Sequence, residues 1–247
     1  MTTRARRWVL LHGFTGGPAT WDEVRATLVK HGDVLCPALV GHGVDAGAAT
    51  DFGAEVDRLA RVIRAAAFEG AHLCGYSLGA RLALGLLVRH PALAARATLI
   101  GVHPGLPERG PERDERAAAD ERWAQLAERA PDQFFAQWRA QPLFATQRAL
   151  PAERQAAQAR TRAAHDGAAL AGALRALSLA RMPDWHPHLP RLALPVHLMA
   201  GELDAKFVAL ARAAAAQLPD ATLTVVPGAG HNLVLERPAA VIAALLG

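Results

Sequence analysis

The sequence predicts an α/β fold, with a mostly parallel sheet, helices on both of its faces and a helical lid inserted before the last two strands. Short apolar runs alternate with helical patterns through the first hundred residues, no buried strand is recognisable from 104 to 190, and strand character returns at 194. Strands joined by helices form a parallel sheet that is covered on both faces. We therefore expect one α/β domain over 1–247, with the lid at about 104–190.

The first hundred residues supply four expected strands and three expected helices. In chain order these are the strand 7–13, the helix 20–32, the strand 33–38, the helix 53–66, the strand 71–76, the helix 78–90 and the strand 97–102. The start, "MTTRARRWVLLHGF", has positive charge before a short apolar run, as a signal peptide does. The run reaches His12 and Gly13 too soon and lacks a small-residue cleavage site, so we expect a first strand in a cytoplasmic protein.

The stretch 104–190 is rich in Ala, Arg, Glu and Gln at helical spacing, and prolines divide it into short pieces. After it, the expected elements are the strand 194–201, a helix near 206–217, the strand 221–228 and a helix near 237–246. Because the strands resume, the inserted part is expected to be a lid on one domain rather than a second domain.

Composition argues against several classes of protein. The chain has no lysine-rich tail and no aromatic RNA-binding signature, so a nucleic-acid partner is not expected. No apolar stretch approaches the roughly 20 residues that cross a bilayer. Cys36 and Cys74 lack ligand-like spacing. We expect no membrane insertion, no metal and no organic cofactor, and the sequence does not indicate the oligomeric state.

The pentapeptide Gly75-Tyr76-Ser77-Leu78-Gly79 places a serine between two glycines, after an apolar run and before a helical one. A nucleophilic serine at such a junction sits on a tight turn that projects its hydroxyl above the sheet. The five-residue pattern alone often occurs by chance, and a small polar turn residue is the alternative. The strand before it and the helix after it favour a nucleophile.

A serine hydroxyl needs a base, and the base needs an orienting carboxylate. His231 follows the last expected strand, where a loop can return its imidazole to Ser77, and Asp204 follows the preceding strand. Separately, these residues are compatible with a loop histidine and a helix N-cap. Their order along the chain, Ser77, Asp204, His231, is the order of an α/β-hydrolase triad.

Two backbone amides are candidates for an oxyanion hole. The stretch "HGFTGG" (12–17) follows the first strand, and Leu78 follows the serine. Amides at these two places stabilise a developing oxyanion in enzymes with this turn. We expect the Phe14 N–H and the Leu78 N–H to be the donors, the alternative for 12–17 being a flexible loop at the end of a strand.

These motifs resemble the α/β-hydrolase superfamily over essentially the full chain, and more closely the 2-succinyl-6-hydroxy-2,4-cyclohexadiene-1-carboxylate (SHCHC) synthases of menaquinone biosynthesis. The stretches that carry the closer resemblance are "GYSLGARLAL" (75–84), "HPGL" (103–106), "DERWAQL" (120–126), "QWRAQPLF" (137–144), "LSLARMPD" (177–184), "GELDAKF" (201–207) and "AGHN" (229–232). The resemblance implies a lyase that eliminates pyruvate from 2-succinyl-5-enolpyruvyl-6-hydroxy-3-cyclohexene-1-carboxylate, with the Ser-His-Asp group assisting proton abstraction. The sequence departs from the family pattern at Arg139, often tyrosine, and at Val234, often histidine.

The implied substrate is a small polycarboxylate, so its pocket should contain cations. Arg81 lies one helical turn after the serine and can face the same pocket. Arg116 and Arg162 match the family's other substrate-binding arginines, with Arg113 and Arg160 as near alternatives in the lid. Surface solvation is the alternative for each arginine.

Two aromatic residues complete the expected binding site. Trp138 matches a tryptophan that lines the family's pocket, and Tyr76 adjoins the serine; each can instead pack within or under the lid. A carboxylesterase or thioesterase with an acyl-serine intermediate is the alternative function, and a non-catalytic ligand receptor is a third. Thirteen arginines lie between residues 104 and 191. A lid of this kind favours a polyanionic ligand, whereas an apolar lid would favour an esterase.

Overall fold

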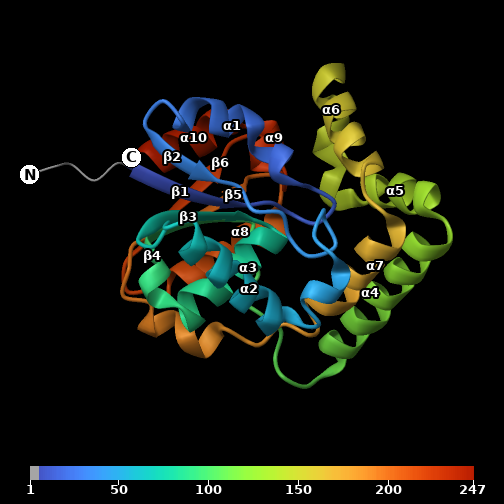
Figure 1. Ribbon diagram of the computed structural model, residues 1–247, viewed down its shortest axis with the longest axis horizontal. Helices are drawn as coiled ribbons and strands as arrows, with labels where there is room; N and C mark the ends of the chain where they lie inside the picture. Colours follow the sequence, from blue (N-terminus) through green and yellow to red (C-terminus); the bar gives the residue numbers. More distant parts are fainter. Residues whose placement is uncertain (1–5) are drawn as a thin grey trace, which may run out of the picture.

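A computed structural model describes residues 6–247, and Figure 1 shows a twisted sheet between helical layers, with a further group of helices beside it. The six strands are all parallel and lie in the order β2-β1-β3-β4-β5-β6. Their bounds are β1 (Arg6–Leu11), β2 (Gly32–Leu35), β3 (Ala71–Tyr76), β4 (Ala94–Ile100), β5 (Val196–Gly201) and β6 (Ala221–Val226). Residues 1–5, the start of the expected N-terminal segment, lie outside the described residues.

Helices cover both faces of the sheet because alternate strand residues point to opposite sides. Trp8 and Leu10 of β1 pack on one face, while Val9 and Leu11 pack on the other. The first face is covered by α1 (Asp22–Leu28) and α10 (Pro238–Leu246), and the second by α2 (Phe52–Ala65), α3 (Leu78–Arg89) and α8 (Ala205–Ala215). This arrangement confirms the predicted fold class.

Three expected elements differ from the structure by three residues or more at one end. β2 stops at Leu35 rather than at 38, and Pro37 has no N–H with which to continue the strand ladder. β4 begins at Ala94 rather than at 97. Ala95 and Arg96 are exposed, so the first residues of the strand do not form an apolar run. The helix expected over 20–32 is a short 3₁₀ turn followed by α1, which ends at Leu28.

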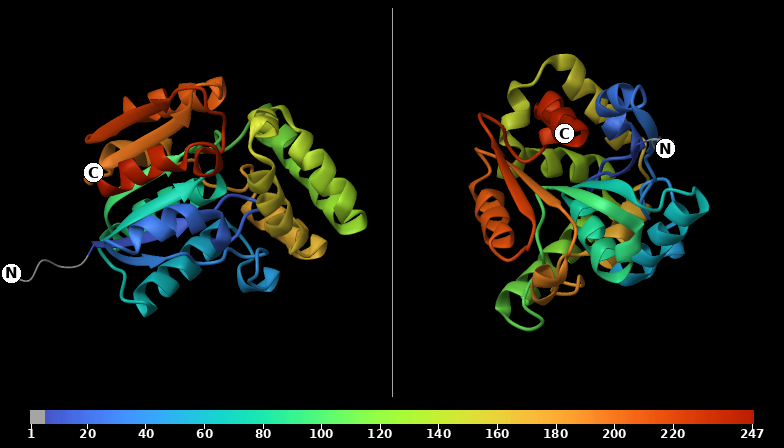
Figure 2. Two further views of the ribbon diagram at one scale, coloured as in Figure 1. Left: turned by 90° about the horizontal axis from the view of Figure 1, so that it is seen from above. Right: turned by 90° about the vertical axis from the view of Figure 1, so that its left-hand side faces the viewer.

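The inserted helices lie beyond the carboxyl ends of the strands, opposite the edge where the N- and C-termini lie (Figure 2). They are α4 (Pro111–Arg129), α5 (Pro131–Ala140), α6 (Ala152–Ala163) and α7 (Gly167–Leu177), with 3₁₀ segments at Pro142–Ala149 and His186–Arg191. Proline opens α4 and α5, where its missing N–H costs no hydrogen bond. After α7 the chain rejoins the main core through Leu179, Met182 and Trp185. The lid boundary at 104–190 stays a prediction.

Within residues 6–247, no helix combines the length and the apolar character that a membrane span requires.

Candidate active site

Ser77 occupies the sharp turn between β3 and α3. Its backbone has φ 53° and ψ −109°, a conformation that side chains other than glycine rarely adopt. The flanking glycines permit the close packing of this turn, because a Cβ on Gly75 would overlap the Gly79 carbonyl and one on Gly79 would overlap the Leu11 carbonyl. The Ser77 N–H donates to the Ile100 carbonyl at 2.9 Å, which fixes the turn to β4.

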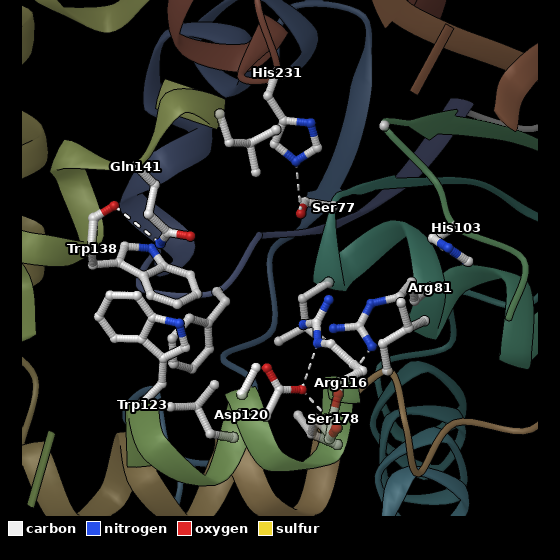
Figure 3. Close-up of a pocket in the computed structure, with 18 of the residues that line it drawn as sticks. Ser77, Arg81, His103, Arg116, Asp120, Trp123, Trp138, Gln141, Ser178 and His231 are labelled. Carbon is white, nitrogen blue, oxygen red and sulfur yellow. Dashed lines mark hydrogen bonds and ion pairs between the residues drawn. The ribbon is translucent and has the colours of Figure 1, made fainter. Parts of the chain in front are cut away.

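The structure brings Ser77, His231 and Asp204 together from the ends of β3, β6 and β5. Ser77 Oγ and His231 Nε2 are 3.0 Å apart, and His231 Nδ1 and Asp204 Oδ2 are 2.7 Å apart (Figure 3 shows the first pair). In the tautomer in which Nδ1–H donates to Asp204, Nε2 is left free to accept from the Ser77 hydroxyl. The imidazole is therefore placed to receive the serine proton.

The loop that carries His231 is held by hydrogen bonds to the residues before and after the histidine. The buried carboxylate of Glu236 accepts the Gly230 N–H at 2.7 Å and the Asn232 N–H at 3.2 Å. Gly101 leaves room for the imidazole ring, since a Cβ at this position would lie 2.9 Å from His231 Cε1. These contacts restrict the imidazole to the orientation that faces Ser77.

A cavity of about 400 Å³ opens in front of Ser77 and His231. Figure 3 shows Trp123, Trp138 and Gln141 on one side and Arg81, Arg116 and His103 on the other. The size is within the usual range for a small-molecule site. An apolar wall facing a cationic wall suits a ligand with a ring and carboxylates.

The cationic wall is held by hydrogen bonds. Arg81 Nη1 donates to the Leu177 carbonyl at 3.0 Å, and Arg116 Nε donates to Asp120 Oδ2 at 2.8 Å. Burial, with a smaller effect of Arg116, lowers the pKa of Arg81. Burial also lowers the pKa of His103 to about 4, aided by nearby cations, so its imidazole is neutral at pH 7. Two arginines therefore remain available to anions in this wall.

The amides expected to form an oxyanion hole lie next to the same cavity. Phe14 and Leu78 both line it, and among residues 6–247 neither backbone N–H donates to another protein group. The following residue, Thr15, has φ 59° and donates its N–H to His42 Nε2 at 3.1 Å. His12 holds the start of this loop, with Nδ1 against the Gly13 carbonyl at 2.9 Å and Nε2 accepting from the Leu39 N–H at 3.3 Å.

Because His12 is completely buried, its state of protonation should affect stability. Burial lowers its pKa from 6.5 to about 4, so the folded protein resists protonation that the unfolded chain accepts. The contribution of neutral His12 to the free energy of unfolding is therefore fully present above about pH 6.5. It is lost as the pH decreases towards 4, and the loss amounts to roughly 3 kcal/mol. Urea unfolding at pH 7 and pH 4 should give a smaller decrease for His12→Gln than for the parent. Equal decreases in the two proteins would contradict this account.

The remaining predicted site residues divide into two groups. Arg81, Arg116, Trp138 and Tyr76 line the cavity with Ser77. Arg162 does not: its guanidinium lies 5.9 Å from the Phe144 ring centre, whose own centre is 6.3 Å from the His231 ring. Arg162 instead lines an adjacent pocket together with Phe14 and Tyr76, which also line the Ser77 cavity, and its contact with the substrate stays a prediction.

Neither alternative arginine lines this cavity. Arg113 donates to the main-chain carbonyls of Pro107, Leu106 and Met182 and ties the start of α4 to the core. Arg160 lies on α6.

Several cavity residues were missed from the sequence as individual contacts. Asp120 is buried and joins Arg116 to Ser178, whose hydroxyl donates to Asp120 at 2.6 Å. His103 lines the cavity, as do Trp123, Lys206 and Phe207. Each lies within a stretch that carried the family resemblance, namely "DERWAQL", "LSLARMPD", "HPGL" or "GELDAKF", so those motifs were the available signal.

A parallel sheet with a serine turn after β3 and a facing histidine after β6 is typical of the α/β hydrolases. The family model described as alpha/beta hydrolase family matches residues 8–244, and the chain belongs to this family.

The chain is also similar to individual proteins with this fold. The chain is 38% identical to a 2-succinyl-6-hydroxy-2,4-cyclohexadiene-1-carboxylate synthase from Enterobacter sp. (strain 638), over 96% of this chain and 89% of the relative. MenH from S. aureus superposes with a TM-score of 0.94 at 26% identity, over 100% of this chain and 94% of MenH. A thermophilic esterase from Thermogutta terrifontis superposes with a TM-score of 0.81 at 25% identity, over 98% and 88%.

Proposed function

We propose that the protein is an SHCHC synthase, a lyase that eliminates pyruvate from 2-succinyl-5-enolpyruvyl-6-hydroxy-3-cyclohexene-1-carboxylate. One observation carries the proposal: the Ser77–His231 pair opens into a cavity that holds two arginines opposite two tryptophans. This cavity suits a cyclic substrate with three carboxylates. The near full-length similarity to a synthase of that name supports the same reaction.

The first step is proton removal from the substrate ring. His231 Nε2 accepts the Ser77 hydroxyl proton, while Asp204 holds the imidazole and stabilises its positive charge. The serine oxygen then takes the proton from the ring carbon that bears the succinyl group, which the adjacent ketone acidifies. Negative charge develops on the ketone oxygen, and the Phe14 and Leu78 amides are the proposed donors to it.

Electron movement completes the elimination without water. The electron pair from the broken C–H bond forms a new ring double bond, and the existing double bond moves one position towards the enolpyruvyl ether. The ring C–O bond breaks, and enolpyruvate leaves and becomes pyruvate by taking up a proton, which balances the proton that His231 received from Ser77. The remaining ring is the 2,4-cyclohexadiene of the product name.

Arg116 is proposed to bind one substrate carboxylate, so Arg116→Gln should weaken substrate binding. The loss of a charged hydrogen bond predicts a KM increase of about tenfold or more, with a smaller change in kcat. Arg122, exposed on the same helix, supplies the matched control Arg122→Gln. Steady-state kinetics on the three proteins test this; equal KM values for Arg116→Gln and the parent would remove Arg116 from the binding site.

The alternative function is a carboxylesterase or thioesterase, in which Ser77 attacks an acyl carbon and water releases the acyl group. The structural similarity to the Thermogutta terrifontis esterase favours keeping this candidate. Polar recognition groups in the cavity favour the lyase, because Arg81 and Arg116 offer no advantage to a neutral ester.

A single pair of assays tests the two functions. Purified protein is mixed with the enolpyruvyl cyclohexene substrate, and pyruvate is measured against spontaneous release; short-chain aryl esters are tested in parallel. The proposal predicts accelerated pyruvate formation and little ester turnover. Pyruvate formation at the spontaneous rate would reject the lyase assignment. The cytoplasmic location and the absence of a cofactor stay predictions.

A further inference from the structure

The oxyanion donor proposed at Phe14 depends on the conformation of the loop that follows β1. Thr15 has φ 59°, a left-handed conformation that costs free energy in a residue other than glycine, so neighbouring groups must hold it. The Gly13 carbonyl accepts from the Gly16 N–H at 3.0 Å and from His12 Nδ1–H at 2.9 Å. Because the C=O and N–H of a trans peptide point in opposite directions, these bonds turn the Phe14 N–H away from His12.

A second buried histidine holds the next peptide of this loop. His42 is 2% exposed; its Nε2 accepts the Thr15 N–H at 3.1 Å, and its Nδ1–H donates to the Val40 carbonyl at 3.0 Å. These two partners require a neutral ring with its proton on Nδ1. Burial lowers the pKa of His42 well below 6.5, with a smaller effect of His12, which agrees with a neutral ring. The Thr15 N–H therefore has a fixed acceptor beside Phe14.

The segment that carries His42 is held by an ion pair on α2. The Val40 N–H donates to Glu55 Oε1 at 3.0 Å, and Glu55 is fully buried. Arg58 donates to the two Glu55 oxygens at 2.6 and 2.8 Å, and to the Ala38 carbonyl at 2.9 Å. These bonds connect α2 through the segment to the loop after β1.

Aromatic contacts join His42 to that loop and to the lid. The centre of the His42 ring lies 5.2 Å from the Phe14 ring centre, at an interplanar angle of 85°. It lies 5.2 Å from the ring centre of His165, which is between α6 and α7, at an angle of 81°. Such edge-to-face arrangements are favourable. His42 thus lies where the loop after β1, the main domain and the lid meet.

We propose that His42 is a positioning residue for the oxyanion hole: it holds the Phe14–Thr15 peptide so that the Phe14 N–H stays aimed at the oxygen where negative charge develops. His42 acts through this peptide and not on the substrate, since it is not part of the lining of the Ser77 cavity within residues 6–247. The role rests on the proposed function. Removing an oxyanion donor lowers kcat by about 10²- to 10³-fold, so a misaligned donor should cost part of this factor.

Two amide variants separate the hydrogen bond to Thr15 from the rest of the imidazole. In His42→Gln the amide oxygen can replace Nε2 and accept the Thr15 N–H, whereas the shorter side chain of His42→Asn reaches only the Val40 carbonyl. In steady-state pyruvate release, kcat should stay within about threefold of the parent for His42→Gln and fall about 10- to 100-fold for His42→Asn. KM should change little, because the cavity arginines are intact. Equal kcat values in the two variants, or a larger loss in His42→Gln, would overturn the inference.

His72→Leu is a matched control for the loss of a buried histidine. His72 is 7% exposed, pairs through Nε2 with Thr98 Oγ1 at 2.8 Å, and belongs to β3 outside the lining of the Ser77 cavity. This variant should lower the thermal midpoint and keep kcat within about twofold of the parent. His42→Leu removes both hydrogen bonds, replaces His42→Asn where that variant does not fold, and should show the same loss of kcat. Equal kcat values in His72→Leu and His42→Leu would leave His42 a structural role only and overturn the inference.

Failure of this inference can be distinguished from failure of the proposed function, because pyruvate elimination and ester hydrolysis both develop an oxyanion. If the parent hydrolyses aryl esters and does not release pyruvate, the lyase proposal fails, and the same variants are compared by their kcat on the ester. A parent that is active in neither assay would overturn the proposed function and this inference together.

Discussion

The Ser77→Ala variant is expected to lose pyruvate-releasing activity by a factor of about 10³ or more, because the substitution removes the oxygen that takes the ring proton. His231 Nε2 lies 3.0 Å from that oxygen and cannot occupy its place, since Asp204, Glu236 and the space beside Gly101 fix the ring. The loss should appear in kcat, with KM changed little. Initial rates of pyruvate formation measure both parameters.

Folding and binding controls separate this effect from structural damage. Ser77 already has a strained backbone, and alanine at this position should keep the fold, as judged by the thermal midpoint and circular dichroism. Binding of the product should also be retained, because the cavity arginines are unchanged. A folded Ser77→Ala variant with near-parental kcat would mean that another group removes the proton.

The second large effect is expected for Asp204→Asn, which should lower kcat by about 10³- to 10⁴-fold. The parent carboxylate accepts from His231 Nδ1–H at 2.7 Å and leaves Nε2 free for the serine proton. An asparagine amide can donate to Nδ1 instead, which places the ring proton on Nε2 and blocks acceptance from Ser77. The measurement is again kcat for pyruvate release.

The chain contains a matched control for this substitution. Asp184 Oδ1 and His186 Nδ1 form a second aspartate–histidine pair, 2.6 Å apart and outside the lining of the Ser77 cavity. Asp184→Asn should leave kcat within about twofold of the parent, since neither residue of this pair lines the Ser77 cavity. Equal losses in the two variants would indicate a general loss of stability rather than a role for Asp204.

The central part of the fold was predictable because its signals are local. β3 matches the expected strand at both ends, and α3 begins at Leu78 as expected, since an apolar run, a glycine-flanked turn and a helical pattern follow each other directly. β2 and β4 were less predictable. Pro37 shortens the first, and the exposed pair Ala95 and Arg96 hides the start of the second.

The meeting of the three triad residues was predictable because fold topology determines their proximity. Parallel strands place the ends of β3, β5 and β6 at one edge, so Ser77, Asp204 and His231 were expected to meet there. Lid residues lack such a constraint, because their positions depend on how separate helices pack. Asp120 was therefore missed although it orients Arg116, and the contact of Arg162 with the substrate stays a prediction.

The most direct test of Ser77 as a base uses substrate that carries deuterium on the ring carbon bearing the succinyl group. Single-turnover pyruvate release is compared for the deuterated and ordinary substrates, and the intact protein mass is recorded during the reaction. The account predicts slower release from the deuterated substrate and no acyl group on Ser77. Equal release rates together with an acyl-serine mass increase would contradict it.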